Sequence, residues 1–273
     1  MLRKINAILT VTGISKKGFF IPYRYANDLS VPEYPEIINH FSRQENTFRE
    51  YLSAINSYGD FISNNISSED LNLRWNQDWF PRSDAAAAYT FIRKKLPKIV
   101  IEIGSGHSTR FLLKGIIDQK LDSKLICIDP NPRAKIPIHK NILHISKTLQ
   151  SIDLDIIKIK PNDILFVDSS HILMPGSDVD IIVNRLLPRF PIGSIVHFHD
   201  ILLPDDYPKE WKWRNYNEQS IISTLISSGS WQVEWSSHYI LTKMHSEFYS
   251  TVLSDIEILP NALETSIWLK KLK

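Results

Sequence analysis

The sequence predicts an α/β fold in which a doubly wound, mostly parallel β-sheet carries helices on both faces. From Lys98 onward, short β-branched runs alternate with helical stretches. The runs are apolar along their whole length, which is typical of strands buried on both faces of a parallel sheet. We expect strands at 99–103, 125–128, 142–145, 164–167 and 194–198, and helices after Ser108 and at 149–157, 178–187 and 217–227.

The chain after residue 230 shows a different pattern. The segments 231–236 (WQVEWS) and 238–244 (HYILTKM) have no helical stretch between them. They predict an antiparallel hairpin at one edge of the sheet. The final residues 262–273 (ALETSIWLKKLK) are expected to dock on the domain.

Residues 1–82 predict a helical extension or lid, and residues 83–273 predict the sheet domain. In the extension, apolar residues recur at helical spacing, namely Ile37, Phe41, Phe48, Leu52 and Ile55. A further helix is expected to begin at a cap formed by Ser83 or Asp84 and to end before Pro97.

The composition indicates a folded chain with nearly balanced charge. Hydrophobic residues make up 43% of the chain, and there are 32 basic and 30 acidic side chains. The hydrophobic fraction excludes global disorder. The nearly equal numbers of basic and acidic residues argue against a dedicated nucleic-acid-binding protein. Cys127 is the only cysteine, which excludes an intrachain disulfide and fits a cytoplasmic location.

The first twenty residues are basic and briefly apolar. They superficially resemble a signal peptide, but no small-residue cleavage site follows, so we expect them in the mature protein. Lys4, Lys16 and Lys17 flank the apolar stretch. Two interpretations stay open: a helix packed on its own domain, and a peripheral contact with a membrane surface.

The sharpest local motif is IVIEIGSGHSTRFLL at 99–113, where a buried strand runs into a glycine pair and then a helix. Gly104 and Gly106 allow backbone amides to approach a ligand, and the start of a helix favours anionic or polar groups. The next strand ends at Asp129, where an acidic residue meets a ribose hydroxyl in nucleotide-binding βαβ units. With Glu102 before the glycines, the pattern predicts an adenosine-type ligand.

These residues resemble the class I S-adenosylmethionine-dependent methyltransferases, whose first motif is similar to Glu102–Gly106. The likeness is greatest to a bacterial branch that includes macrolide-sugar O-methyltransferases and cephalosporin-hydroxylase-like proteins. The resemblance implies a Rossmann-like sheet of seven strands with an antiparallel last strand. It also implies S-adenosylmethionine as cofactor, bound by Glu102, Gly104, Ser105, Gly106, Ser108, Asp129 and Asp168. A dinucleotide is less favoured, because serine and threonine replace the third glycine.

A second group of polar residues follows two later strands, in NDILFVDSSH (162–171) and GSIVHFHD (193–200). The carboxyl ends of parallel strands meet at one sheet edge, so Asp168 and Asp200 can converge on a cation such as Mg²⁺. The resemblance to metal-dependent O-methyltransferases implies that these two acids bind a divalent metal. It also implies that His171 is the catalytic base.

Several residues allow a structural interpretation beside the functional one. His197 and His199 share a strand face, and at least one is expected to be structural; Cys127 is expected to pack in the core. The run 216–219 (YNEQ) is expected to cap a helix. Five aromatic residues could stack on an acceptor or pack in the core or a lid: Trp75, Trp79, Phe80, Trp211 and Trp213.

The function expected from the sequence is methyl transfer to a hydroxyl of a small molecule or glycan, with homo-oligomerisation left open. Two alternatives remain. A non-haem Fe(II) oxygenase would use His197 or His199 with Asp200 and His171. A non-catalytic binding module would keep the fold and recognise a glycan or a partner protein.

Overall fold

The computed structural model describes residues 2–29, 34–65 and 73–273. The chain forms two compact units, residues 1–32 and 33–273. Within the smaller unit, α1 (Leu2–Val11) is followed by a short 3₁₀ turn, η1 (Ala26–Asp28). No helix in the described part of the chain has the length and apolar character needed to cross a membrane.

The larger unit is built on a seven-stranded sheet with the order β3-β2-β1-β4-β5-β7-β6. The first five strands pair in parallel, and β7 runs antiparallel to both of its neighbours. This confirms the predicted Rossmann-like sheet with an antiparallel last strand. The strands are β1 (Ile99–Ile103), β2 (Lys124–Ile128), β3 (Ile142–Ile145), β4 (Ile164–Val167), β5 (Ile195–Phe198), β6 (Trp231–Ser236) and β7 (Ile267–Lys271).

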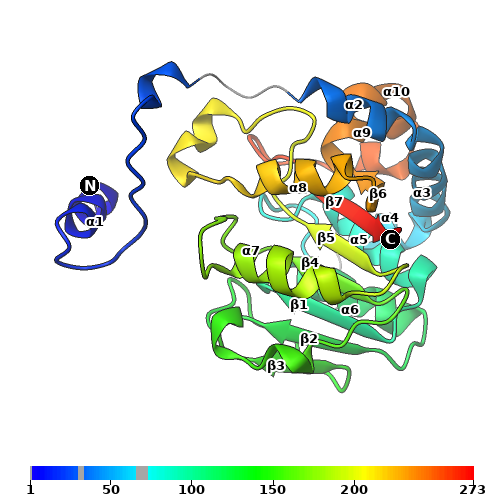
Figure 1. Cartoon of the computed structure of the whole chain (residues 1–273). Coiled ribbons are helices and arrows are strands. Elements are labelled where there is room, and N and C mark those ends of the chain that lie inside the picture. Colours follow the sequence, from blue (N-terminus) through cyan, green and yellow to red (C-terminus); the bar gives the residue numbers. More distant parts are fainter. Residues whose placement is uncertain (1, 30–33, 66–72) are drawn as a thin grey trace. The chain divides into compact units, whose positions relative to one another are not determined.

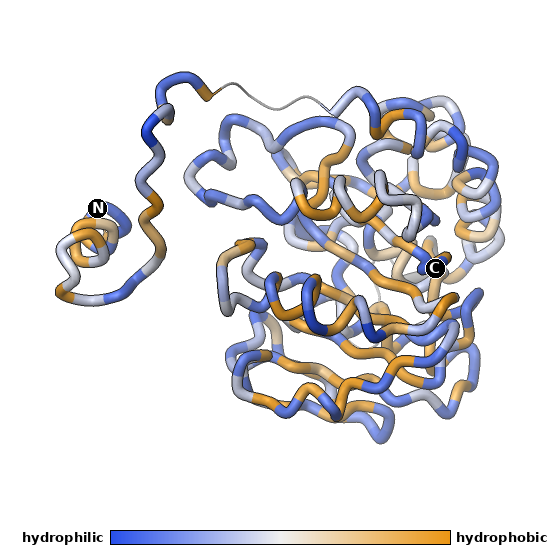
Figure 2. Tube along the Cα trace, in the orientation of Figure 1, coloured by the Kyte–Doolittle hydropathy of each residue, from blue (hydrophilic) through white to orange (hydrophobic). Residues whose placement is uncertain are grey.

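Helices cover both faces of the sheet, as its apolar central strands require (Figures 1 and 2). Behind the sheet in Figure 1, α5 (Arg82–Lys95) packs on α6 (Ser108–Asp118). The approach is close, because a Cβ on Gly115 would lie 2.9 Å from Cβ of Ile92. On the front face lie α7 (Asp178–Ile181) and α8 (Glu218–Ser227).

The helices predicted before residue 82 lie in the same compact unit as the sheet. They are α2 (Pro35–Ser42), α3 (Glu45–Ser57) and α4 (Gly59–Asn65), and the expected apolar positions are buried. Helix α3 packs on α5 and β6, and α2 packs on α8. A lid function for this region stays a prediction.

The predicted C-terminal hairpin is wrong in its second strand. Residues 238–244 lie largely in α9 (Ser237–Lys243), because the Ser236 side chain accepts a hydrogen bond from Tyr239 N and starts a helix directly after β6. Short elements follow, α10 (His245–Tyr249) and η8 (Val252–Asp255). The partner of β6 is β7, within the tail that was expected only to dock.

Two other expectations need correction. The helix predicted at 149–157 is reduced to two 3₁₀ turns, η3 (Leu149–Ser151) and η4 (Leu154–Ile156), because the extended Asp153 breaks the run and caps the second turn. The 178–187 helix begins as α7 and continues as a π-helical turn, η5 (Ile182–Leu186), and a 3₁₀ turn, η6 (Leu187–Arg189). A longer 3₁₀ segment, η7 (Lys209–Arg214), precedes α8.

Helix α5 starts at Arg82, one residue before Ser83, the first of its two expected caps. Pro81 occupies the cap position, and neither Ser83 nor Asp84 caps the helix. Both are fully buried, and Asp84 accepts hydrogen bonds from the backbone amides of Thr265 and Ser266 at 3.0 Å each. Asp84 therefore ties α5 to the segment that leads into β7.

Candidate active site

The glycine loop after β1 is held against the end of β4. Gly104 has a φ of +80°, and a Cβ there would lie 1.8 Å from the carbonyl oxygen of Asp168. Its amide donates to Ile128 O at 3.1 Å. Only glycine fits this position, because both the backbone conformation and the contact exclude a side chain. The loop therefore joins the ends of β1, β2 and β4.

Glu102 is completely buried below this loop. Its carboxylate accepts hydrogen bonds from Ser108 Oγ at 2.7 Å and from Thr109 Oγ1 at 2.6 Å. Thr109 Oγ1 in turn accepts from the amide of Gly106 at 3.1 Å. Burial raises the pKa of Glu102 to about 7, although these hydroxyls oppose the shift. Glu102 and Ser108 thus support the loop from inside the protein.

Asp129 lies at the end of β2 and holds the outer side of the loop. Its two carboxylate oxygens accept from the amides of Ser105 at 2.8 Å and Asn131 at 2.7 Å. The residue is half-buried. Each carboxylate oxygen keeps a further lone pair for a hydroxyl donor, which is what a ribose presents.

The loop leaves space and polar groups for a ligand. Among the described residues, a Cβ on Gly106 would meet a single neighbour within 4 Å, Cβ of Arg133 at 3.9 Å, so there is space beside it. In the described structure Ser169 Oγ is buried without a hydrogen-bond partner, and Ser169 Cα adjoins Gly104. Together with Asp129, these groups fit an adenosine-type cofactor.

His171 stands at the centre of the second cluster. Its side chain is buried, with Nδ1 3.0 Å from Glu218 Oε2. Its Nε2 lies 3.3 Å from Asp168 Oδ1 and 3.5 Å from Asp200 Oδ2. The ring also contacts Tyr216, with centroids 4.5 Å apart. The structure therefore brings the three predicted residues Asp168, His171 and Asp200 together.

A second histidine, His199, lies on the other side of the two aspartates. Its Nδ1 is 3.7 Å from Asp168 Oδ1 and 3.5 Å from Asp200 Oδ1. Its Nε2 lies 3.3 Å from Asp84 Oδ2, so the cluster is tied to the start of α5. His199 is thus part of the site.

The charged groups in this cluster shift one another's pKa values. Burial alone would lower the pKa of His171, but hydrogen bonds to Asp168 and Glu218 raise it well above its ordinary value. Burial likewise opposes charge on His199, yet Asp168 and Asp84 raise its pKa to about 9. Burial would raise the pKa of Asp168, but the two histidines hold it below its usual range. The carboxylates around the two rings therefore favour the charged form of each imidazole.

Two residues of the cluster have strained backbones. His171 has a φ of +58° and Asp200 a φ of +55°. Non-glycine residues in this region cost about 1–3 kcal/mol each and persist where the surrounding structure enforces them. The enforcing contacts at His171 are the amides of Asn217 and Glu218, which donate to its carbonyl oxygen at 3.1 and 3.3 Å.

The aspartates predicted as metal ligands do not fit a divalent cation in this arrangement. Asp200 Oδ2 faces His171 Nε2 at 3.5 Å and Arg214 Nη1 at 3.4 Å, so cationic side chains already balance it. Within residues 2–29, 34–65 and 73–273, no three His, Cys, Asp or Glu side chains are grouped to hold a metal ion.

His197 is structural, as expected for one of the two strand histidines. It is fully buried, its Nε2 lies 2.9 Å from Ser266 Oγ, and its ring stacks on Phe166. Burial lowers its pKa well below the ordinary value. Cys127 is also buried, in the packing position expected of it.

Three residues before and in the first turn of α8 were expected to cap that helix and instead hold loops. Glu218 is fully buried against His171. Asn217 Oδ1 accepts from Leu173 N at 2.6 Å, and Gln219 Oε1 accepts from Leu202 N at 2.7 Å. The signal in the sequence was this polar run, Asn-Glu-Gln, directly before an apolar helix.

The five aromatic residues differ in burial and surroundings. Trp75 and Phe80 are buried and pack on Phe111 in the core. Trp79 and Trp213 are 48% and 54% exposed. Trp211 stacks under Arg214, the residue that pairs with Asp200, and so belongs to the surroundings of the second cluster.

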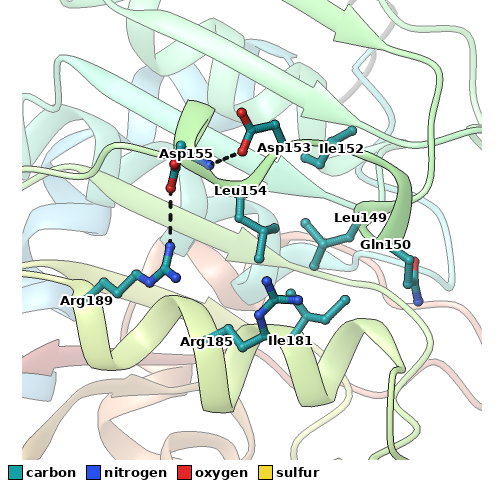
Figure 3. A pocket seen from close by; sticks show the side chains of 9 residues that line it. All are labelled: Leu149, Gln150, Ile152, Asp153, Leu154, Asp155, Ile181, Arg185 and Arg189. Atoms are coloured by element: carbon teal, nitrogen blue, oxygen red, sulfur yellow. Dashed lines mark hydrogen bonds and ion pairs between the residues drawn. The ribbon is translucent and has the colours of Figure 1, made fainter.

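A hollow of about 370 Å³ lies apart from these clusters, between η3, η4 and the end of the α7 segment (Figure 3). Leu149, Leu154 and Ile181 line it together with Arg185 and Arg189. None of the predicted site residues contributes to its wall.

Comparison with known proteins agrees with the geometry. Residues 101–201 match a family model described as a methyltransferase domain. The match runs from β1 to the residue after Asp200, so it includes the glycine loop and Asp168, His171, His199 and Asp200. Glu218 and Asp84 lie outside it. The matched residues form the central strands β1, β2, β3, β4 and β5 of the Rossmann-like sheet. No curated protein matches the chain significantly.

Several solved structures match the chain at low sequence identity. The SAH-bound methyltransferase PaMTH1 of Podospora anserina has 12% identity and a TM-score of 0.42, over 94% of this chain and 100% of that one. The plantazolicin methyltransferase BamL, in complex with a triazolic desmethylPZN analog and SAH, has 15% identity and a TM-score of 0.44, over 84% and 100%. The CmcI-N160 apo-structure has 13% identity and a TM-score of 0.43, over 71% and 72%.

Proposed function

We propose that this protein is an S-adenosylmethionine-dependent methyltransferase that methylates a hydroxyl group of a small molecule or glycan. The observation that carries the proposal is the position of Asp168. Its backbone packs against Gly104 of the glycine loop, and its side chain faces His171 at 3.3 Å. A proton-accepting pair thus lies directly beside the loop proposed to hold the cofactor.

In this proposal the cofactor lies along the loop 104–106, with its ribose hydroxyls on Asp129. Glu102 and Ser108 contribute by holding the loop, because their side chains are bonded to each other at 2.7 Å. When bound, S-adenosylmethionine supplies a methyl group activated by the sulfonium charge. The remaining task of the protein is to align the acceptor and to remove its proton.

The acceptor hydroxyl loses its proton as its oxygen bonds to the methyl carbon and the C–S bond breaks, with the electron pair left on sulfur. The Asp168 side chain is 23% exposed and that of His171 is 2% exposed. The hydroxyl would therefore meet Asp168 first, and we propose that the proton ends on His171 Nε2. Since His171 must be neutral to accept it, its raised pKa predicts higher activity on the alkaline side.

We propose this step without a metal ion, because the side chains of His171 and Arg214 face Asp200 at 3.5 and 3.4 Å. The oxygenase alternative has no comparable support. His197 is bonded to Ser266, and no metal-binding group is formed by the described side chains. A non-catalytic module would be indicated by cofactor binding without methyl transfer to any acceptor.

The test is transfer of a labelled methyl group from S-adenosylmethionine to a panel of hydroxylated small molecules and glycans. We expect transfer by the natural protein and a loss of about 100-fold or more in His171→Ala, with cofactor affinity kept. The matched control is His245→Ala, at an exposed histidine far along the chain. Full activity in His171→Ala would remove this residue from the mechanism.

A further inference from the structure

The N-terminal unit presents an apolar row that nothing within it covers. In α1, side chains three residues apart are neighbours on the helix surface. Leu2, Ile5, Ile8 and Val11 follow this spacing and are 73%, 43%, 61% and 59% exposed. No residue of 2–29 is buried.

A second apolar stretch follows a reversal of the chain. Gly13 has a φ of +75°, and Lys17 N donates to Thr10 Oγ1 at 3.0 Å, which folds the segment back on the end of α1. The residues that come next are Phe19, Phe20 and Ile21, at 51%, 63% and 64% exposed. Figure 2 shows hydrophobic colouring in both α1 and the segment that follows it.

The N-terminal unit is more basic than the rest of the chain. The chain has 32 basic and 30 acidic side chains. Residues 2–29 contain five of the basic and one of the acidic side chains, so the remainder contains 27 basic and 29 acidic ones. The five are Arg3, Lys4, Lys16, Lys17 and Arg24. A net positive segment with exposed apolar side chains is complementary to a surface that is anionic outside and apolar beneath.

We propose that residues 2–29 form a docking surface for an anionic lipid bilayer. The row on α1 and the stretch 19–21 enter the interfacial region, and the basic side chains lie at the headgroups. The ten residues of α1 are too few to span a bilayer, so the segment lies on the membrane and does not cross it. This surface is independent of the proposed methyl transfer.

The test is sedimentation of the full chain with vesicles, either pure phosphatidylcholine or containing about 30% phosphatidylserine. We expect binding to the anionic vesicles that is at least about tenfold tighter than to neutral ones. Raising salt from about 0.1 to 0.5 M should weaken it by a similar factor, because the charges are screened. Equal binding to both vesicle types, or none, would overturn the proposal.

Two variants separate the apolar and ionic contributions. Ile5→Ser/Ile8→Ser keeps the charge, and its control Asn6→Ser/Thr12→Ser changes polar positions of the same segment. Lys16→Gln/Lys17→Gln removes two charges, and its control Lys140→Gln/Lys147→Gln removes two exposed charges from the larger unit. Each test variant should lose affinity about tenfold or more, while each control stays within about twofold.

Unchanged thermal unfolding of the larger unit in all four variants shows that lost binding reflects the docking surface. Sedimentation velocity without vesicles tests the alternative that a second copy of the chain covers the apolar row. A concentration-dependent dimer that disappears in Ile5→Ser/Ile8→Ser would show that a second copy of the chain covers the apolar row, and would overturn the membrane proposal.

Discussion

His171 Nδ1 lies 3.0 Å from Oε2 of Glu218, a fully buried carboxylate 47 positions further along the chain. This contact fixes the ring so that Nε2 points to Asp168 and Asp200. In the proposed mechanism Glu218 is therefore a positioning residue. It also favours the charged imidazolium and contributes to the raised pKa of His171.

Glu218→Gln should lower turnover and move the pH profile. Removing the negative charge lowers the pKa of His171, so the acid limb of the rate profile should move to lower pH by about one unit. We expect turnover to fall about tenfold with cofactor affinity unchanged. Glu210→Gln, at an exposed position, provides the control. A profile that stays in place would show that Glu218 does not act through His171.

The two glycines of the loop should respond differently to alanine. In Gly104→Ala the new Cβ meets Asp168 O at 1.8 Å at a φ of +80°. We expect this variant to lose about 3 kcal/mol or more of unfolding free energy. Gly106→Ala has room for its Cβ and should keep its thermal stability, but should bind cofactor about tenfold more weakly. Equal stability of both variants in thermal unfolding would contradict the structure of the loop.

Glu102 should make the stability of the cofactor-free protein depend on pH. Its pKa is raised from 4.5 to about 7 by burial, so the folded state favours the protonated acid. The resulting stabilisation is complete below pH 4.5 and is lost as pH rises through 7, by up to about 3 kcal/mol. Denaturant unfolding from pH 5 to 8 should show this decline, with a flatter profile in Glu102→Gln. Parallel profiles would show that another group causes the decline.

Chelation should not affect methyl transfer. The carboxylate of Asp200 lies 3.5 Å from His171 Nε2 and 3.4 Å from Arg214 Nη1, and a divalent cation would have to displace these contacts. We expect equal turnover after dialysis against EDTA and no rise on adding Mg²⁺. Loss of activity on chelation, restored by Mg²⁺, would show that the cluster rearranges into a metal site.

The sheet was predictable from the sequence because its strands are short, β-branched and buried on both faces. Bounds at β1, β3 and β4 match the expected residues. The predicted hairpin is wrong at α9, because the helix cap formed by the Ser236 side chain outweighs the strand-like composition of the residues that follow. The true partner of β6 lies beyond two further helices, a separation that local patterns do not encode.

The site was predictable where residues end strands and less so where distant segments meet. Asp168, His171 and Asp200 come together because β4 and β5 are parallel neighbours. Glu218 and Asp84 were missed as members of the site, since each lies near a helix start where capping is the usual role. Their contacts with His171 and His199 arise only from tertiary packing.

The most direct test of the central claim is calorimetric titration of the full chain with S-adenosylmethionine and S-adenosylhomocysteine. We expect micromolar affinity for both, and a marked loss in Asp129→Asn, because in the proposal the carboxylate receives the ribose, and in the structure it holds the amide of Ser105. Asp155→Asn, at a side chain 81% exposed, should bind as the natural protein does. Absence of binding to either compound would contradict the methyltransferase assignment of this site.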